Sequence, residues 1–244
     1  MKAWGMTHPG IVRETNEDAY AIWVSDDGRR GFFAVCDGMG GAQAGEIASK
    51  LAIDAFCAEM EPLKAGAFTL KKAQEQIQKA ADSANRSIYM SALEIPERAG
   101  MGTTMVSMTC NAFSVAVGNI GDSRAYLADE NGLNQLTEDH SLVHEMIRRG
   151  ELTPEQAVRH PSRNVITRAL GVDGKVPCDL FALETKPGDM LLLCSDGLTG
   201  EVSGPEIYYE IYQRGEPETA CAHLIELAKN RGGHDNITVV LVVF

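Results

Sequence analysis

The amino-acid sequence predicts an α+β protein built around antiparallel sheets. Most of the expected strands follow one another through short turns, and the expected helices come in separate pairs. With 244 residues, the chain is long enough to bury a large apolar core in one unit. We therefore expect a single domain over residues 1–244.

The first half of the chain is expected to contain three strands and then a pair of helices. Apolar residues recur at helical spacing from about Gln43 to Met60 and again from about Thr69 to Leu93. The strands are short runs rich in β-forming residues, at 4–8, 19–24 and 31–36.

The second half is expected to continue with strands and to end with a second helix pair. Segment 139–176 interrupts this pattern with loops and short helical stretches. The expected helices lie near 205–213 and 217–230. The expected strands lie at 103–110, 112–119, 123–128, 133–137, 178–184, 189–194 and 236–243.

Composition excludes several classes of function. The net charge of −12 argues against general binding to nucleic acids or to anionic membranes. The N-terminal residues lack the apolar core of a signal peptide, and no run approaches 18 apolar residues, so we expect a cytoplasmic protein. The six cysteines form no C-x-x-C pair and are typical of small buried side chains in a reducing compartment.

Four aspartates stand at the boundaries of predicted strands, each beside Gly, Ser or Asn. They are Asp37, Asp122, Asp196 and Asp235. If the strand ends converge, these carboxylates raise one another's pKa or bind a cation. Oxygen ligands of this kind favour hard cations such as Mg²⁺ or Mn²⁺. The sequence therefore predicts a metal centre at one end of the sheets.

Other interpretations of the same motifs are weaker. Segment 37–41, DGMGG, fails the dinucleotide fingerprint because Gln43 holds the last glycine position, and it also lacks the Lys of a P-loop. His140 and His144 have the spacing of a zinc pair but lack a third ligand. A helix N-cap at Asp139 or Ser141 is the favoured role for that segment.

Arg13 lies among the acidic residues Glu14, Glu17 and Asp18. A solvated surface ion pair would explain this cluster taken alone. Beside four strand-end carboxylates, we favour a planar guanidinium that acids hold in place to bind a phosphate.

A set of short motifs follows one another along essentially the whole chain. They are RETNED (13–18), DGMGG (37–41), GTT (102–104), GDSR (121–124), LTEDHS (136–141), RNVITRALG (163–171), SDG (195–197) and HDNIT (234–238). In this order they resemble the metal-dependent protein phosphatases of the PP2C type, and the short form resembles the bacterial members. The resemblance implies a β-sandwich of two antiparallel sheets flanked by pairs of helices.

The resemblance also implies a set of metal ligands. Asp37 would bridge two tightly bound Mn²⁺ or Mg²⁺ ions, with the Gly38 carbonyl on one of them. Asp196 and Asp235 would hold the other ion. Asp122, together with Asp196, would bind a weaker third ion.

Further roles follow from the same resemblance. Arg13 would bind the phosphoryl oxygens, and Glu17 and Asp18 would support the metal-bound waters. Segment 139–176 would be a mobile flap beside the site. Its residues 139–175 carry six basic against five acidic side chains, so we expect Arg163 and Arg168 to attract phosphopeptides.

The expected activity is hydrolysis of phosphoserine and phosphothreonine in proteins by a metal-activated bridging water. Several family members carry a histidine after the Asp-Gly pair as a general acid; this chain has Met39, which cannot donate a proton. We expect a monomer that acts in signalling on phosphorylated proteins, the products of a Ser/Thr kinase. The alternatives are a catalytically silent binding module and a phosphatase for small phosphoesters.

Overall fold

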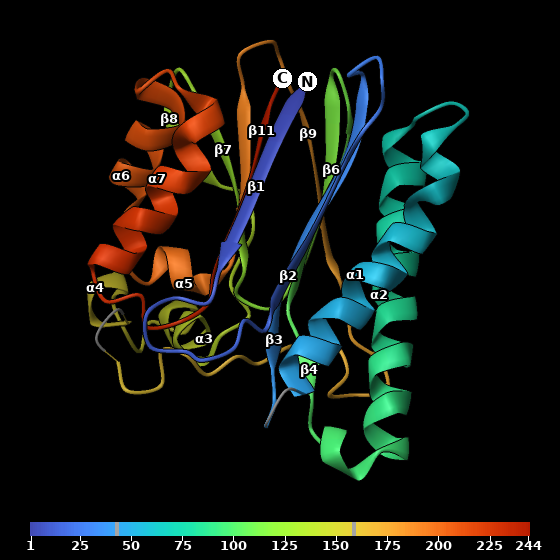
Figure 1. The fold of residues 1–244 in the computed structure, drawn as a ribbon, viewed down its shortest axis with the longest axis vertical. Helices are drawn as coiled ribbons and strands as arrows, with labels where there is room; N and C mark the ends of the chain where they lie inside the picture. The colour runs from blue at the N-terminus through green and yellow to red at the C-terminus, as the bar shows by residue number, and fades with distance from the viewer. Residues whose placement is uncertain (42–43, 158–159) are drawn as a thin grey trace.

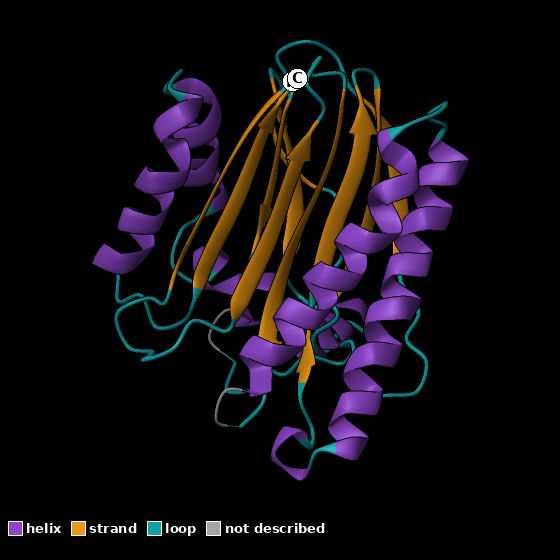
Figure 2. Ribbon diagram, turned by 45° about the vertical axis from the view of Figure 1, so that its right-hand side comes forward, coloured by secondary structure: helices purple, strands orange, loops and turns teal. Residues whose placement is uncertain are grey.

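Two antiparallel sheets lie face to face at the centre of the molecule, and helices cover both outer faces (Figure 1, Figure 2). The computed structural model describes residues 1–41, 44–157 and 160–244. Both termini lie at the same end of the sandwich, and the α3, α4 and α5 helices lie toward the opposite end (Figure 1). The predicted sandwich of two antiparallel sheets is confirmed.

The first sheet has the strand order β1-β11-β10-β7-β8, and the second has the order β2-β3-β5-β6-β9 with β4 paired to β3. The strands of the first sheet are β1 (Lys2–His8), β11 (Ile237–Val243), β10 (Met190–Cys194), β7 (Arg124–Asp129) and β8 (Gly132–Gln135). Those of the second are β2 (Asp18–Val24), β3 (Arg30–Met39), β4 (Gly102–Thr103), β5 (Met105–Asn111), β6 (Ser114–Ile120) and β9 (Asp179–Glu184).

Two helix pairs cover the sheets, as the sequence predicts. The pair α1 and α2 packs on the second sheet, and the pair α6 and α7 packs on the first (Figure 1). A π-helical turn at Tyr209–Gln213 extends α6, and a 3₁₀ turn at Pro96–Arg98 follows α2. The helices are α1 (Ala44–Lys64), α2 (Leu70–Glu94), α3 (Leu142–Arg148), α4 (Pro154–Ala157), α5 (Asp196–Thr199), α6 (Gly204–Tyr208) and α7 (Pro217–Asn230).

Strand β3 shows why the central strands are almost entirely apolar. Phe32 and Ala34 point toward the α1–α2 pair, whereas Phe33 and Val35 point toward the other sheet. Because both faces of the strand are covered, alternation between polar and apolar residues disappears. The sandwich thus has three apolar layers, one between the sheets and one beneath each helix pair.

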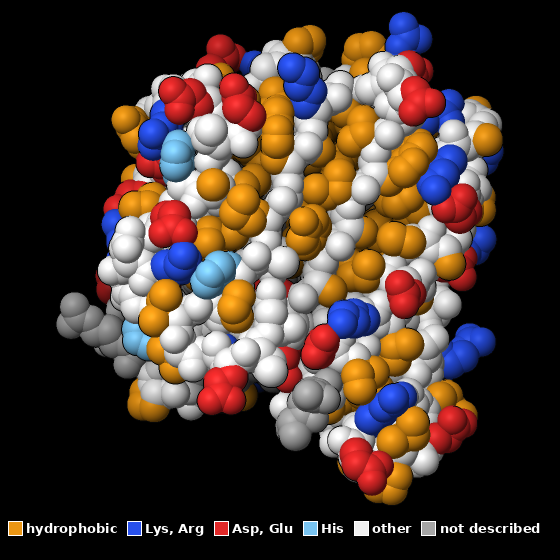
Figure 3. Space-filling model, in the orientation of Figure 1, with side chains coloured by type: hydrophobic (Ala, Val, Ile, Leu, Met, Phe, Trp, Pro, Cys, Tyr) orange, Lys and Arg blue, Asp and Glu red, His pale blue; other side chains and the backbone are white. Residues whose placement is uncertain are grey.

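The edge strands β1 and β2 lie on one face of the molecule, where apolar side chains crowd between them (Figure 3). Met6 and Ile22 are partly exposed there. Tyr20 donates a hydrogen bond of 3.4 Å to the Gly5 carbonyl, which ties the two sheets together at this edge. Within the described residues, no helix has the length and apolar character needed to cross a membrane.

The structure differs from the expected elements in three places. The expected strand 103–110 is divided at Thr104, and β3 continues to Met39 instead of ending near residue 36. The short helix α5 was not expected, because four residues are too few for a periodic pattern. The expected start of the first helix at Gln43 lies outside the described residues.

The contact between α2 and β6 predicts a local limit on side-chain size. A Cβ atom at Gly118 would lie 2.3 Å from Cγ2 of the buried Ile77 and 3.1 Å from the Cys178 sulfur. We expect Gly118→Ala to lower the free energy of unfolding by about 1–3 kcal/mol, measured by urea denaturation. Gly174→Ala is the control, because a Cβ there has no neighbour within 4 Å among the residues that the structure describes. Equal stability of the two variants would contradict this packing argument.

Candidate metal centre

The carboxylates that the sequence singles out converge in one pocket of about 230 Å³. They come from the end of β3, the β6–β7 turn, the start of α5 and the residues just before β11. The structure also brings Arg13 and Glu17 to this pocket. The described residues that line it are Arg13, Glu17, Asp37, Gly38, Met39, Gly40, Thr104, Asp122, Asn164, Ile166, Asp196 and Asp235.

Asp37 is held rigidly by the residues that interrupt the next strand. Its backbone N–H donates to the Thr104 hydroxyl at 2.9 Å, and its carbonyl accepts from the Thr103 hydroxyl at 2.8 Å and the Thr104 N–H at 2.9 Å. The Thr104 hydroxyl also lies 2.7 Å from that of Ser123, beside Asp122. The break in the expected strand therefore couples two of the carboxylates.

Gly38 is required by a close approach of three backbone segments. Its N–H donates to the Glu17 carbonyl at 3.1 Å. A Cβ at this position would lie 2.1 Å from the Gly45 carbonyl oxygen and 2.6 Å from that of Glu17. The glycine thus lets the start of α1 and the loop before β2 close around the pocket.

Asp18 lies behind the pocket and joins the two sheets. It pairs with Asp37 in the β2–β3 register. Its Oδ2 accepts hydrogen bonds from Ser195 at 2.8 Å and from Thr238 at 2.6 Å, both in the other sheet region. Asp18 is buried and does not line the pocket, so the supporting role that the resemblance implies stays a prediction.

Asn236 organises the loop that carries Arg13 and Glu17, and the sequence analysis missed it. Its Oδ1 accepts from the Glu17 N–H at 2.7 Å. Its side-chain amide donates to the carbonyls of Pro9 at 3.0 Å and Thr15 at 2.9 Å. The HDNIT motif contains this residue, but only the fold shows that it binds a loop more than 200 residues away.

Burial and mutual repulsion make the metal-free cluster hold protons. Burial, together with neighbouring carboxylates, raises the pKa of Asp18 and of Asp122 to about 7. The same causes raise the pKa of Asp37 well above its usual range, and they raise that of Asp196. Burial also raises the pKa of Glu17, although Arg13 opposes the rise.

The donor set fits hard divalent cations. Among the described residues, one carboxylate oxygen of Asp18 and one of Asp196 are buried without a hydrogen-bond partner. In the same part of the chain, no group of three or more His, Cys, Asp or Glu side chains is placed so that these side chains alone could hold a metal ion. Sites for Mg²⁺ or Mn²⁺ need no such cage, because these ions keep several waters and use few carboxylates. Carboxylate and carbonyl oxygens are the ligands such ions prefer.

Arg13 reaches the pocket from the loop before β2. Its Nη2 donates to Asp235 Oδ2 at 2.9 Å, and its side chain is 51% exposed. The guanidinium thus lies at the mouth of the pocket, paired with one of the expected metal ligands. An exposed ion pair of this kind stabilises the fold little, so the expected role of Arg13 in binding phosphoryl oxygens stays a prediction.

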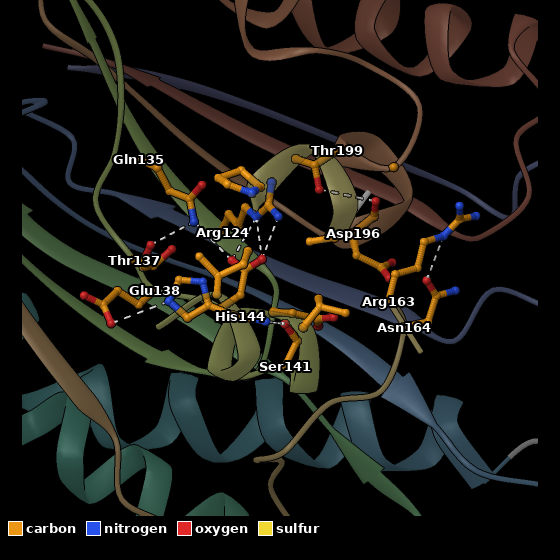
Figure 4. Close-up of a pocket in the computed structure, with 17 residues that line it drawn as sticks. Arg124, Gln135, Thr137, Glu138, Ser141, His144, Arg163, Asn164, Asp196 and Thr199 are labelled. Carbon is orange, nitrogen blue, oxygen red and sulfur yellow. Dashed lines mark hydrogen bonds and ion pairs between the residues drawn. The ribbon is translucent and has the colours of Figure 1, made fainter. Parts of the chain in front are cut away.

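The two flap arginines lie in different surroundings. Arg163 lines a second pocket of about 500 Å³, where its Nε donates to Asn164 Oδ1 at 3.3 Å (Figure 4). Arg168 instead donates to Asp179 Oδ1 at 2.6 Å, at the start of β9. Arg159, counted with the basic flap residues, lies outside the described residues. The role of Arg163 and Arg168 in attracting phosphopeptides stays a prediction from the sequence.

His140 and Ser141, in the flap region, have structural partners. Nδ1 of His140 accepts from the Gly121 N–H at 2.9 Å, so its Nε2 carries the proton that faces Asp179 at 3.0 Å. Both ring nitrogens of His140 are thus used in hydrogen bonds, which argues against a zinc site formed by His140 and His144. Ser141 caps α3 by accepting from the His144 N–H at 3.3 Å, which confirms one of the two favoured capping residues.

Comparison with known proteins agrees with this geometry. The family profile described as Protein phosphatase 2C matches residues 11–227. The chain belongs to the protein phosphatase 2C family. This confirms the family that the sequence motifs indicate.

Named relatives extend the similarity over nearly the whole chain. The chain is 38% identical to "Serine/threonine phosphatase stp" of Listeria innocua, over 99% of this chain and 95% of that protein. It is 40% identical to "Serine/threonine protein phosphatase PstP" of Mycobacterium tuberculosis, over 95% of this chain but 43% of that protein.

Solved structures show the same fold. The crystal structure of Stp1 from Staphylococcus aureus superposes with a TM-score of 0.91 at 36% identity, covering all of this chain and 94% of that one. The catalytic domain of PstP, solved in complex with two manganese ions, superposes with a TM-score of 0.85 at 34% identity, covering 98% and 96%. Binding of manganese within this family therefore agrees with the predicted metal dependence.

The raised pKa values predict how metal-free protein responds to pH. Asp18 and Asp122 titrate near pH 7 when folded, against a usual value of 3.8. Because the folded state holds these protons more tightly than the unfolded state, their stabilising contribution is full below about pH 4 and is lost as pH rises through 7. Mn²⁺ should therefore raise Tm more at about pH 8 than at about pH 5 in differential scanning fluorimetry.

Asp122→Asn is the matched control, because it removes one of these carboxylates while keeping the shape. We expect its metal-free form to melt several degrees above the metal-free wild type at about pH 8 and close to it at about pH 4. A variant less stable than wild type at pH 8 would refute the electrostatic account of the cluster.

Proposed function

We propose that this chain hydrolyses phosphoserine and phosphothreonine in proteins, using two divalent ions and a weaker third. The single observation that carries this proposal is the convergence of Asp37, Asp122, Asp196 and Asp235 beside an arginine in one open pocket, where Asp122 is buried and the other three are partly exposed. Such a cluster is costly without cations. An arginine at its mouth suits a phosphate ester.

The proposed ligands line the pocket, and the family resemblance assigns them to individual ions. Asp37 and the Gly38 carbonyl would hold one ion, and Asp37, Asp196 and Asp235 would hold the second. Asp122 would hold the third together with Asp196. The ions would supply Lewis acidity and an activated water, so that no protein nucleophile is needed.

The residues of this chain bind and orient the substrate. Arg13 moves from Asp235 Oδ2 to the phosphoryl oxygens, which its planar donors can grip in pairs. Glu17 and Asp18 accept hydrogen bonds from the waters around the cluster. Met39 lines the pocket but has no proton to donate. The side chain after the Asp-Gly pair therefore cannot protonate the leaving oxygen.

The substrates are proposed to be phosphoproteins made by a Ser/Thr kinase. The names of the relatives support the protein-phosphatase class. A monomeric state and a cytoplasmic location stay predictions from the sequence.

The activity is tested by hydrolysis of p-nitrophenyl phosphate and of phosphopeptides. We expect turnover with Mn²⁺ or Mg²⁺ and loss of it with a chelator, restored by added metal. Arg13→Lys keeps the charge but loses the paired donors, so we expect kcat/KM to fall at least about tenfold. A folded protein that is inert with every metal would be the silent binding module instead. Faster turnover of small metabolites than of phosphopeptides would favour the small-phosphoester alternative.

Asp122 lines the pocket from a turn, where an aspartate can also serve the backbone alone. If it belongs to the reacting site, Asp122→Ala should fold with near-normal stability and still bind the two tight ions, measured by calorimetry. Its kcat should fall at least about tenfold, about 1.4 kcal/mol of barrier. The loss should be larger for phosphoserine, whose alkoxide needs a proton, than for p-nitrophenyl phosphate. Full activity on both substrates would show that Asp122 serves only the turn and takes no part in the reaction.

A further inference from the structure

A second pocket of about 500 Å³ shares walls with the metal centre. Asp122, Asn164 and Asp196 line both pockets. We call this second one the flank pocket, and we call its apolar lining, which consists of Val143, Ile147, Pro154 and Ala157, the floor. A peptide advances by about 3.3–3.6 Å per residue when extended. A substrate whose phosphate lies at the metal centre can therefore place the side chain of an adjacent residue in the flank pocket.

The floor of the flank pocket is apolar. Val143 and Ile147 come from α3, and Pro154 and Ala157 come from α4. These two short helices occupy the segment between β8 and β9 that the resemblance identifies as the flap. Nothing in the function described so far uses this apolar surface.

The charged wall of the flank pocket is already paired within the protein (Figure 4). Asp139 accepts from Arg124 through two atoms, Nε at 2.9 Å and Nη2 at 2.6 Å, and from the Gln135 amide at 3.0 Å. The remaining guanidinium nitrogen of Arg124 donates to the Tyr126 hydroxyl at 3.1 Å. This wall is therefore built to be rigid, and its acid is not available to bind a cationic ligand.

The hydroxyl groups of the pocket are also engaged. Thr137 accepts from the Ala125 N–H at 3.1 Å, Ser141 accepts from the His144 N–H, and Thr199 donates to the Asp196 carbonyl at 3.4 Å. Glu138 lies 3.8 Å from His144 and is 64% exposed, at the solvent side. Apart from Arg163 and the two carboxylates shared with the metal centre, Asp122 and Asp196, the surface that remains for a ligand is chiefly the apolar floor.

We propose that the flank pocket binds an apolar side chain of the substrate, one or two residues from the phosphoserine or phosphothreonine. This inference rests on the proposed function and adds a sequence preference to it. Burial of an apolar side chain on this floor is favourable. A charged side chain placed there loses its hydration without gaining a partner.

The test compares phosphopeptides that differ only at positions flanking the phosphothreonine. Leucine, lysine or aspartate is placed at one position at a time, and kcat/KM is measured with Mn²⁺. We expect leucine to exceed both charged residues at least about fivefold at one flanking position. Equal rates at every flanking position would overturn the inference while leaving the phosphatase function intact. Turnover of p-nitrophenyl phosphate without turnover of any phosphopeptide would overturn both.

Variants of Ile147 test whether the preference for an apolar residue arises at the floor of the flank pocket. Ile147→Glu places a charge on the floor, so we expect the leucine-to-lysine ratio of kcat/KM to fall to about one or below. Ile147→Leu should keep the wild-type ratio. Met90→Glu, which adds the same charge at an exposed position of α2, should also keep it.

A second substitution guards against a folding defect in the charged variant. Ile147→Ala widens the floor without adding charge, so the preference should move from leucine toward phenylalanine. Because each readout is a ratio within one variant, a general loss of activity does not mimic it. An unchanged ranking of the peptides in Ile147→Ala, or an unchanged ratio in Ile147→Glu, would contradict the proposal.

Discussion

Burial of several carboxylates at one end of a β-sandwich is the constraint on which the rest of this structure depends. Burial, together with repulsion from neighbouring carboxylates, raises the pKa values of Asp18, Asp37, Asp122 and Asp196. Evolution of a purely structural core would avoid such a cluster, because each buried charge costs stability. A hard cation turns the same arrangement into a stabilising one, so the fold and the metal are coupled.

The two sheets deliver the carboxylates with little help from long loops. Asp37 lies within β3 and is clamped by Thr103 and Thr104, whereas Asp18 reaches across to Ser195 and Thr238. The hydrogen bonds from Ser195 and Thr238 to Asp18 therefore join the two sheets and also position the site. This explains why the acids can remain close together despite their repulsion: the surrounding backbone is over-determined.

The secondary-structure elements and the acid cluster could be predicted from the sequence. The apolar runs and helical periodicities predict the elements, and aspartates at strand ends beside Gly, Ser or Asn predict the acid cluster. What the sequence could not reveal depends on long-range contacts. The clamp at Thr104, the loop anchor at Asn236 and the pairing of Arg168 with Asp179 each join segments that only the fold brings together. Long-range contacts also place Arg163 in the flank pocket and Arg168 beside Asp179, although the two lie five residues apart in the sequence.

The coupling between protons and metal is the central claim, and calorimetry tests it directly. Mn²⁺ is titrated into metal-free protein at about pH 6.5 in two buffers with different ionisation enthalpies, which counts the protons released on binding. Because Asp18 and Asp122 titrate near pH 7 without metal, the account predicts release of at least about one proton per protein, and less at about pH 8. Binding of Mn²⁺ at pH 6.5 without any proton release would contradict it.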